Sequence, residues 1–183
     1  MRPTERRTWY GTMPVQFRYT PGVAGRRFFE TLRRTGRLAV THCAECRRTY
    51  LPPRLYCEEC FADLSAAWSE VEPRGRVHTY TVVHRDREGR PLREPEVVAY
   101  VRIDGTDGGL VTRLRRIAPA DVRIDLPVEG VLVPRRQRTG SLEDLLGFAP
   151  VGSAGSPTAA RPTAASNPSR PRRSRQPRTS TGA

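Results

Sequence analysis

Two Cys-x-x-Cys pairs place the strongest constraint on what this chain can fold into. They are Cys43–Cys46 and Cys57–Cys60, and they hold all four cysteines of the 183 residues. Each pair can place two thiolates on one tight turn, and two such turns can surround one tetrahedral Zn²⁺ with Zn–S distances of about 2.3 Å. Because four sulfurs fill the coordination sphere, the zinc site predicted from this spacing is structural and leaves no position for water or substrate.

The alternative for the same cysteines is a pair of disulfides or a redox-active Cys-x-x-Cys. The N-terminus Met1–Arg7 is basic, but no apolar signal core follows it, so we expect no secretory targeting. The longest aliphatic run, Val97–Val101, is too short to span a bilayer. We therefore expect a cytoplasmic protein without membrane contact, in which reduced thiols favour metal binding. The predicted zinc ligands are the four cysteines, Cys43, Cys46, Cys57 and Cys60.

The residues before the first pair predict a helix over 20–36, after an irregular aromatic and basic arm over 1–19. Thr20 is suited to the N-cap and Pro21 to the first helical position, and Gly36 is suited to end the helix. Four arginines lie opposite the apolar face of this helix, and they form either a solvated surface or a contact with an acidic partner or a phosphate. They are Arg26, Arg27, Arg33 and Arg34.

From Gly75 onward the sequence alternates as β-strands do, with Val77, Thr79, Thr81 and Val83 on one predicted face. Further strands are predicted over 97–103, 110–114 and 128–133, with a helical turn over 118–121. Residues 141–149 suit either a short helix or a closing strand. Four or five short strands with one interposed helical turn predict a small antiparallel barrel, of which the OB-fold is the best-known type. The expected architecture is mainly β: helix, rubredoxin-like zinc ribbon over 37–72, barrel over 73–150.

Composition separates the remaining residues, 151–183, from the rest of the chain. They are rich in Pro, Ser, Thr and Ala and carry six arginines and no acidic residue, so we predict a disordered tail. The whole chain has a formal net charge of +13. Such a surface attracts polyanions, which include nucleic acids, acidic proteins and the phosphates of nucleotide cofactors.

The order and spacing of several short segments resemble those of a known family over about residues 13–151. These segments are Met13–Phe28, Phe28–Leu32, Gly36–Leu38, Cys43–Cys46, Pro52–Arg54, Cys57–Cys60, Gly75–His84, Asp121–Ile124 and Phe148–Pro150. The family comprises zinc-ribbon plus OB-fold proteins associated with acyl-CoA enzymes, long known as a domain of unknown function. The segment 13–28 is similar to the branch that accompanies thiolases.

The resemblance implies a non-catalytic accessory subunit that binds a thiolase-like or another acyl-CoA enzyme, such as a hydroxymethylglutaryl-CoA synthase or an acyl-CoA hydratase. It also implies that CoA or acyl-CoA meets the OB-fold, and the arginines that we expect at the CoA phosphates are Arg26, Arg54, Arg85 and Arg113. Two features depart from the family. Arg47 replaces the usual glycine after the first cysteine pair, and residues 112–116 are more basic than in relatives.

Two other functions compete with this hypothesis. An OB barrel with basic grooves can bind single-stranded nucleic acid, with Tyr80, Tyr100, His78 and His84 as candidate stacking residues, although ordinary strand packing also explains them. An enzyme acting alone lacks a catalytic constellation in the sequence. The cysteines serve the zinc, and His42 beside Cys43 is not needed as a fifth ligand.

Overall fold

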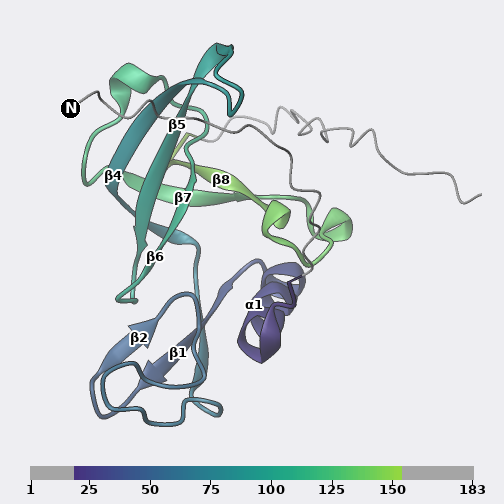
Figure 1. Ribbon diagram of the computed structural model, residues 1–183, viewed down its shortest axis with the longest axis vertical. Coiled ribbons are helices and arrows are strands. Elements are labelled where there is room, and N and C mark those ends of the chain that lie inside the picture. Colours follow the sequence, from purple (N-terminus) through teal and green to yellow (C-terminus); the bar gives the residue numbers. More distant parts are fainter. Residues whose placement is uncertain (1–18, 154–183) are drawn as a thin grey trace, which may run out of the picture. The chain divides into compact units, whose positions relative to one another are not determined.

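The computed structural model describes residues 19–153 and confirms a mainly β fold with one α-helix (Figure 1). The predicted arm over 1–19 and the predicted disordered tail over 151–183 lie outside the described residues, except for Tyr19 and residues 151–153. Within the described part, no helix is long and apolar enough to cross a membrane.

Helix α1 spans Gly22–Thr35 and buries Phe28, Thr31 and Leu32. The predicted start of this helix was wrong by one to two residues. Pro21 occupies the N-cap without a side-chain hydrogen bond, and Thr20 does not cap the helix. Although Pro21 has helical dihedrals (φ −70°, ψ −6°), Gly22 after it has φ 65°, outside the right-handed helical region, so the regular helix does not extend back to Pro21. The predicted end is confirmed: Gly36 has φ 79°, and its N–H donates to Leu32 O at 3.0 Å.

A three-stranded antiparallel sheet of order β2-β1-β3 follows α1 and carries the ribbon. Strand β1 (Leu38–Cys43) is central, with β2 (Arg48–Tyr50) on one side and β3 (Trp68–Val71) on the other. Only one residue of β1 is exposed, because the strand packs on both faces. Since β1 ends at Cys43, the buried strand fixes the position of the first cysteine turn.

A five-stranded sheet of order β6-β5-β4-β7-β8 forms the second sheet. Its strands are β4 (Arg74–Arg85), β5 (Pro91–Ile103), β6 (Gly109–Arg113), β7 (Pro127–Leu132) and β8 (Leu145–Pro150). A parallel bridge between Leu114 and Phe148 joins the two edges, and Arg115 N donates to Phe148 O at 2.7 Å. Gly147 permits this approach, since a Cβ there would lie 2.3 Å from Arg113 O. The sheet therefore closes into a barrel, with the short helix η1 (Pro119–Asp121) between β6 and β7.

The prediction that β4 keeps one alternation throughout was wrong. Val77 pairs with the buried Val101, but beyond the register shift between Val77 and Thr79 it is Tyr80 that pairs with the buried Ala99. Directly paired residues share a face, so the inward side changes from odd to even positions at this bulge. Val82, predicted opposite Val77, consequently packs against the same core as Val77.

Residues 141–149 contain both of the structures that their sequence suits. Ser141 accepts a hydrogen bond from Glu143 N at the start of the short helix η3 (Leu142–Asp144), and β8 follows directly. The side chain of Asp144 is buried and accepts hydrogen bonds from Thr139 N at 2.8 Å and Gly140 N at 2.7 Å. The carboxylate thus holds the turn that leads into the closing strand.

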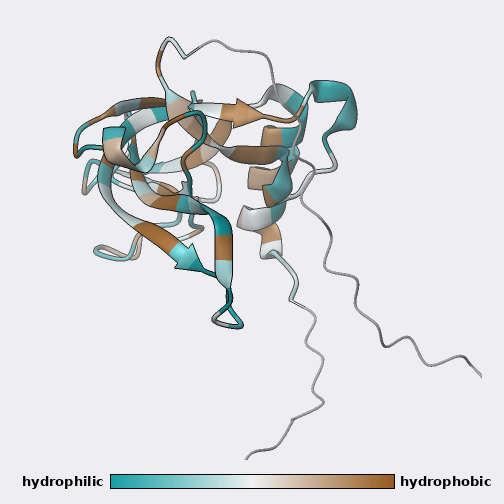
Figure 2. Ribbon diagram, turned by 90° about the horizontal axis from the view of Figure 1, so that it is seen from above, coloured by the Kyte–Doolittle hydropathy of each residue, from teal (hydrophilic) through white to brown (hydrophobic). Residues whose placement is uncertain are grey.

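The ribbon sheet and the barrel share one hydrophobic core. Leu38, Val40 and Leu51 from the ribbon belong to the same cluster of buried side chains as Val77 and Val101 from the barrel. Figure 2 shows that hydrophobic residues recur along α1 and along the strands between hydrophilic ones. The predicted division between 72 and 73 stays a prediction, because this cluster extends across it.

Two hydrogen bonds between Thr49 and Asp107 reinforce the junction between ribbon and barrel. Thr49 N donates to Asp107 Oδ2 at 2.8 Å, and Asp107 N donates to Thr49 O at 2.9 Å. Beside them, a Cβ on Gly108 would lie 2.1 Å from Leu51 O, so only glycine fits there without displacement. The turn 104–108 of the barrel therefore lies directly against the loop between the two cysteine pairs.

Candidate metal centre and arginine pocket

The four cysteine sulfurs come together as the spacing predicts. All four sulfur atoms lie within 4.8 Å of one another, with Cys43 Sγ 3.5 Å from Cys60 Sγ and Cys46 Sγ 3.8 Å from Cys57 Sγ. A tetrahedron of thiolates around zinc has edges of about 3.8 Å when the Zn–S bonds are about 2.3 Å. The four cysteines are free and not joined as disulfides. Their arrangement fits a closed tetrahedral zinc site.

The turns that carry the sulfurs use the left-handed region of backbone conformation. Arg47 follows the first pair with φ 54°, and Phe61 follows the second pair with φ 60°. Arg47 therefore adopts the conformation that the usual glycine would take, at some cost in backbone strain. The turns also bring N–H groups to sulfur, as Cys46 N lies 3.5 Å from Cys43 Sγ and Glu59 N lies 3.5 Å from Cys57 Sγ.

Hydrogen bonds divide the cysteines into a favoured thiolate and a favoured thiol. The backbone N–H of Cys60 and then the Tyr50 hydroxyl, 3.1 Å from Cys57 Sγ, lower the pKa of Cys57 to about 6. The same contact with Cys57, together with burial, raises the pKa of Tyr50 to about 12. Sharing hydrogen bonds with Cys60 raises the pKa of Cys46. Cys57 is thus the cysteine that most readily forms a thiolate near neutral pH, the form that binds a cation.

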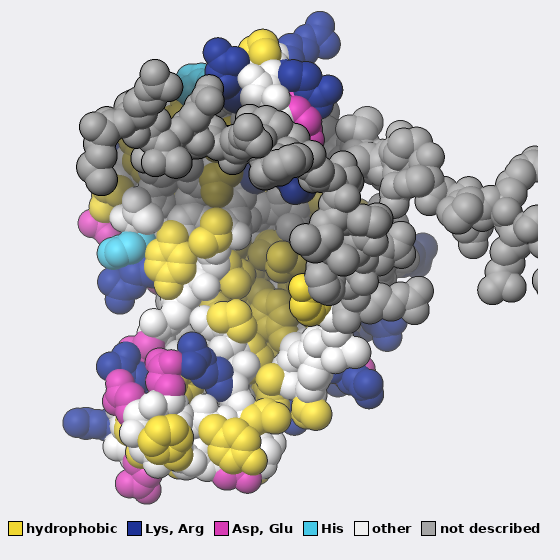
Figure 3. Space-filling view, viewed as in Figure 1, with side chains coloured by type: hydrophobic (Ala, Val, Ile, Leu, Met, Phe, Trp, Pro, Cys, Tyr) yellow, Lys and Arg dark blue, Asp and Glu magenta, His cyan; other side chains and the backbone are white. Residues whose placement is uncertain are grey.

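The two tyrosines between the cysteine pairs divide between core and surface. Tyr50 is buried with Cys43, Cys57 and Leu64 in a small cluster beside the metal site. Tyr56, in contrast, is 61% exposed. Phe61 is also exposed. Figure 3 shows exposed aromatic rings and charges of both signs side by side over the ribbon.

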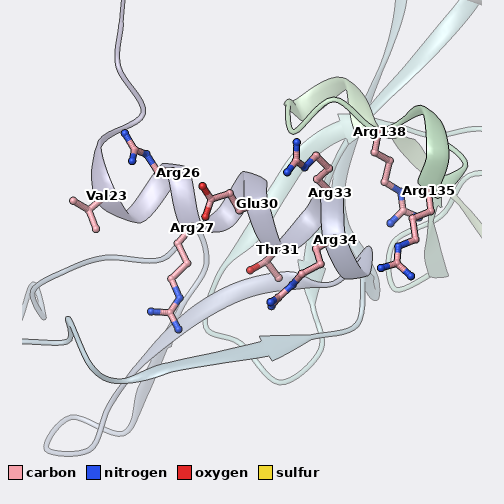
Figure 4. A pocket seen from close by; sticks show the side chains of 9 residues that line it. All are labelled: Val23, Arg26, Arg27, Glu30, Thr31, Arg33, Arg34, Arg135 and Arg138. Carbon is pink, nitrogen blue, oxygen red and sulfur yellow. The ribbon is translucent and has the colours of Figure 1, made fainter.

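A second site is an open pocket of about 820 Å³ along α1. We call it the arginine pocket, because six arginines and a single carboxylate, Glu30, line it (Figure 4). Its lining residues are Val23, Arg26, Arg27, Glu30, Thr31, Arg33, Arg34, Arg135 and Arg138. Arg135 belongs to η2 (Arg135–Gln137) and Arg138 follows it, about a hundred positions beyond the end of α1.

Three of the six arginines already have partners in the fold. The guanidinium of Arg27 lies 4.4 Å from the centre of the Trp68 ring, and Arg34 pairs with Glu70 at 3.3 Å. Arg138 donates to Val133 O at 2.8 Å and to Leu32 O at 3.3 Å, where it satisfies the last turn of α1. Within residues 19–153, the other three make no ion pair or side-chain hydrogen bond, and all are exposed. They are Arg26, Arg33 and Arg135.

The structure does not bring together the four arginines predicted at CoA phosphates. Arg26 alone lines the arginine pocket. Arg54 pairs with Glu58, Arg113 pairs with Glu96 at 2.7 Å, and Arg85 donates to Gly89 O at 2.9 Å. Sequence reasoning singled out the helix arginines but missed Arg135 and Arg138. The run Arg135-Arg136-Gln137-Arg138 was the signal available, although only the fold shows that it meets α1.

The candidate stacking residues of the barrel do not form one platform. Thr79 pairs with Tyr100 and Tyr80 pairs with Ala99, so Tyr80 and Tyr100 lie on opposite faces of the sheet. His78 contacts Tyr100 edge to face, with ring centres 5.9 Å apart. Among the residues that the structure describes, the four cysteines are the one group of side chains able to hold a metal ion.

Comparison with known protein families identifies both the ribbon and the barrel. Residues 31–65 match the family model described as ChsH2, rubredoxin-like zinc ribbon domain. Residues 68–133 match the model described as ChsH2, C-terminal OB-fold domain. Together the two matches cover more than half of the chain, in the order that the structure shows.

Individual relatives agree with this assignment. A DUF35 domain-containing scaffold protein of Methanocaldococcus jannaschii is 29% identical over 90 residues, which are 49% of this chain and 62% of that protein. A probable enoyl-CoA hydratase alpha subunit of Thermomonospora curvata is 36% identical over 94 residues, which are 50% of this chain and 28% of that protein. The chain thus spans less than two thirds of either relative.

Among solved structures, a DUF35 protein of unknown function from Sulfolobus solfataricus is similar. It superposes with a TM-score of 0.51 at 28% identity, and the match covers 60% of this chain and 78% of that one. The four-sulfur centre, the five-stranded barrel and the two matches in sequence therefore agree, and the chain belongs to the DUF35 family of ChsH2-type zinc-ribbon and OB-fold proteins.

Proposed function

We propose that this protein is a non-catalytic accessory subunit of a cytoplasmic acyl-CoA enzyme complex, with a thiolase or hydroxymethylglutaryl-CoA synthase type of enzyme as its partner. The observation that carries the proposal is the closed arrangement of the four sulfurs. Four thiolates leave a zinc ion no position for substrate, so the centre serves the fold and not a reaction. The names of the relatives, a scaffold protein and a hydratase subunit, support the same role.

In this proposal Cys43, Cys46, Cys57 and Cys60 bind one structural Zn²⁺. The ion holds the two cysteine turns together, and the ribbon has only a small core of its own to replace it. The ribbon in turn contributes Leu51 to the core shared with the barrel. Zinc therefore stabilises the surface that a partner subunit meets, without entering its chemistry.

Contact with CoA is a separate part of the proposal. Arg54 and Arg113 are paired with carboxylates of this chain, so a CoA phosphate would have to displace Glu58 or Glu96. Arg85 has no carboxylate partner among the described residues and donates only to a backbone oxygen. We propose that a CoA bound in the complex uses single arginines of this kind beside residues of the partner enzyme.

Co-purification tests the accessory role. The full-length chain is produced together with a thiolase or a hydroxymethylglutaryl-CoA synthase from the same organism, and the mixture is separated by size-exclusion chromatography. We expect a complex of fixed stoichiometry, acyl-CoA turnover by the complex, and no turnover by the isolated chain. A chain that stays apart from the enzyme, or that converts acyl-CoA by itself, would refute the proposal.

The competing nucleic-acid function is tested on the same preparation. Binding of a single-stranded oligonucleotide is titrated at rising salt, with and without residues 151–183. We expect weak binding that disappears with the tail, because that segment carries six arginines and no acidic residue. Tight binding that survives removal of the tail would make the barrel a nucleic-acid reader.

A further inference from the structure

The arginines of α1 form two rows that the fold treats differently. Arg27 and Arg34 lie seven residues apart, and both contact β3, where Trp68 and Glu70 are their partners. Arg26 and Arg33 are also seven residues apart, but neither has a partner among residues 19–153. Figure 4 shows these side chains leaving α1 on different sides. Arg27 and Arg34 therefore stabilise the packing of α1 on β3. Arg26 and Arg33 have no such role among the described residues and are available to bind another molecule.

The unpaired row continues onto a second element. Arg135 of η2 lines the same pocket, and the Cδ of Arg33 lies near the turn at Gly140, 3.5 Å from where a Cβ would be. Arg138 holds this turn against the helix through its hydrogen bond to Leu32 O. Three unpaired guanidinium groups thus share one pocket with only Glu30 to offset them, which makes the pocket a strong attractor of anions.

The two terminal segments outside the described residues are poor sources of an anion for this pocket. Residues 1–18 contain four arginines and one glutamate, and residues 154–183 contain six arginines and no acidic residue. Both segments are therefore net basic, like the pocket itself. A second copy of the chain, with its formal net charge of +13, is a poor occupant for the same reason.

The spacing of the unpaired arginines selects the kind of anion. Seven residues of helix separate Arg26 from Arg33, which is about 10 Å along the axis, so one phosphate group could contact both only if the two side chains turned toward each other. Acidic side chains seven residues apart on a helix have the same spacing. Val23, 67% exposed at one end of the pocket, adds an apolar contact. A nucleic acid is disfavoured because Arg27 covers the ring of Trp68, which would otherwise offer a stacking face beside α1.

We propose that the arginine pocket docks an acidic segment of the partner subunit, whose carboxylates meet Arg26, Arg33 and Arg135. The proposal rests on the accessory role proposed above, because that role supplies the partner. It adds the surface by which this chain is held and the chemistry that the partner presents. Guanidinium groups suit this task because each can bind a carboxylate through two parallel hydrogen bonds.

A defined peptide tests the pocket directly. The probe is a fluorescent helical peptide with glutamates seven residues apart, and its control carries glutamine at the same positions. Binding is measured by anisotropy to the full-length zinc-loaded chain and to the variant R26Q/R33Q/R135Q. The matched control, R87Q/R93Q/R123Q, removes the same charge from exposed arginines outside the pocket. Thermal unfolding checks that both variants remain folded.

We expect the pocket variant to bind the glutamate peptide at least about tenfold more weakly than the wild type, as three lost ion pairs would produce. The control variant should stay within about twofold of the wild type, and the glutamine peptide should bind weakly to all three chains. Equal losses in both variants would overturn the proposal, since bulk charge would then explain the binding. A pocket-dependent affinity for pyrophosphate or an oligonucleotide that exceeds the affinity for the peptide would also overturn it.

Co-purification of the same variants separates this proposal from the proposed function. If the wild type and the pocket variant bind the acyl-CoA enzyme equally well at every salt concentration, the accessory role stands and the docking proposal fails. If the pocket variant alone dissociates at lower salt, both are supported. If the wild-type chain binds no acyl-CoA enzyme, the proposed function fails, and the occupant proposed here fails with it.

Discussion

At the scale of single residues, we expect the contact between Tyr50 and Cys57 to influence how the four-cysteine cluster responds to acid. The hydroxyl lies 3.1 Å from the sulfur and helps to lower the pKa of Cys57 to about 6. A depressed thiol pKa contributes stability above the ordinary thiol range, and that contribution is lost as the pH falls through about 6. Protons and zinc compete for the same sulfur, so acid should release the metal.

Replacing Tyr50 with Phe tests this contact. Without the hydroxyl the pKa of Cys57 rises, so we expect the midpoint of zinc release to move to higher pH. Release is followed with a zinc-sensitive dye during an acid titration. Tyr56→Phe is the matched control, because the ring of Tyr56 is exposed and outside the buried cluster beside the metal site. Coincident midpoints for wild type and Tyr50→Phe would exclude a role for the hydroxyl.

Residue types alone were enough to predict the metal centre but not the arginine pocket. Cysteine has few uses in a reduced chain, and the spacing of two pairs restricts it further, so all four sulfurs were predicted correctly as a cluster. Arginine is common on any surface, and its role depends on what the fold brings near it. Arg27 and Arg33 are alike in sequence, yet Trp68 covers one and nothing described pairs with the other.

At the scale of elements, a single bulge decides what strand β4 contributes to the core. Residue types alternate on both sides of His78, and nothing in the sequence pattern marks the position of the β-bulge. Only pairing with β5 shows that Val77 and Val82 serve the same core. The local sequence pattern was therefore enough to predict that this segment is a strand. Which side chains beyond the bulge face the core could be learned only from the pairing with β5.

The turn before β8 depends on one buried carboxylate. We expect Asp144→Ala to lower the free energy of unfolding by about 2 kcal/mol, because the amides of Thr139 and Gly140 lose their acceptor in a part-buried turn. Urea denaturation of the zinc-loaded chain measures the change. Glu143→Ala, at an exposed neighbouring position, should leave stability within about 0.5 kcal/mol. Equal effects of the two substitutions would contradict this account.

At the scale of the whole molecule, zinc should stabilise the ribbon more than the barrel. The ribbon's own buried cluster consists of Cys43, Tyr50, Cys57 and Leu64, two of which are predicted zinc ligands. We expect a chelator to increase amide hydrogen exchange strongly over residues 43–67 and much less over β4 and β5. Restoring zinc should restore protection. Uniform exchange across both parts after chelation would mean that the metal stabilises the whole chain as one unit.

The contact between Gly108 and the ribbon loop tests how firmly the two parts are joined. A Cβ at this position would meet Leu51 O at 2.1 Å, so we expect Gly108→Ala to cost about 1–3 kcal/mol of stability as the loop moves away. Gly89→Ala is the comparison, since its Cβ would meet nothing within 4 Å and only its φ of 81° opposes alanine. A smaller loss at Gly108 than at Gly89 would show that the junction yields easily.

The shared core limits how such a chain can be recombined. The matches to the two family models stop at residue 65 and resume at residue 68, which invites an exchange of ribbons between relatives at that point. Leu51, however, is buried among barrel residues, and its carbonyl lies against the turn at Gly108. A chimera cut at the boundary would inherit one half of this contact from each parent. Functional hybrids should therefore require the loop around Leu51 and the turn 104–108 to come from the same parent.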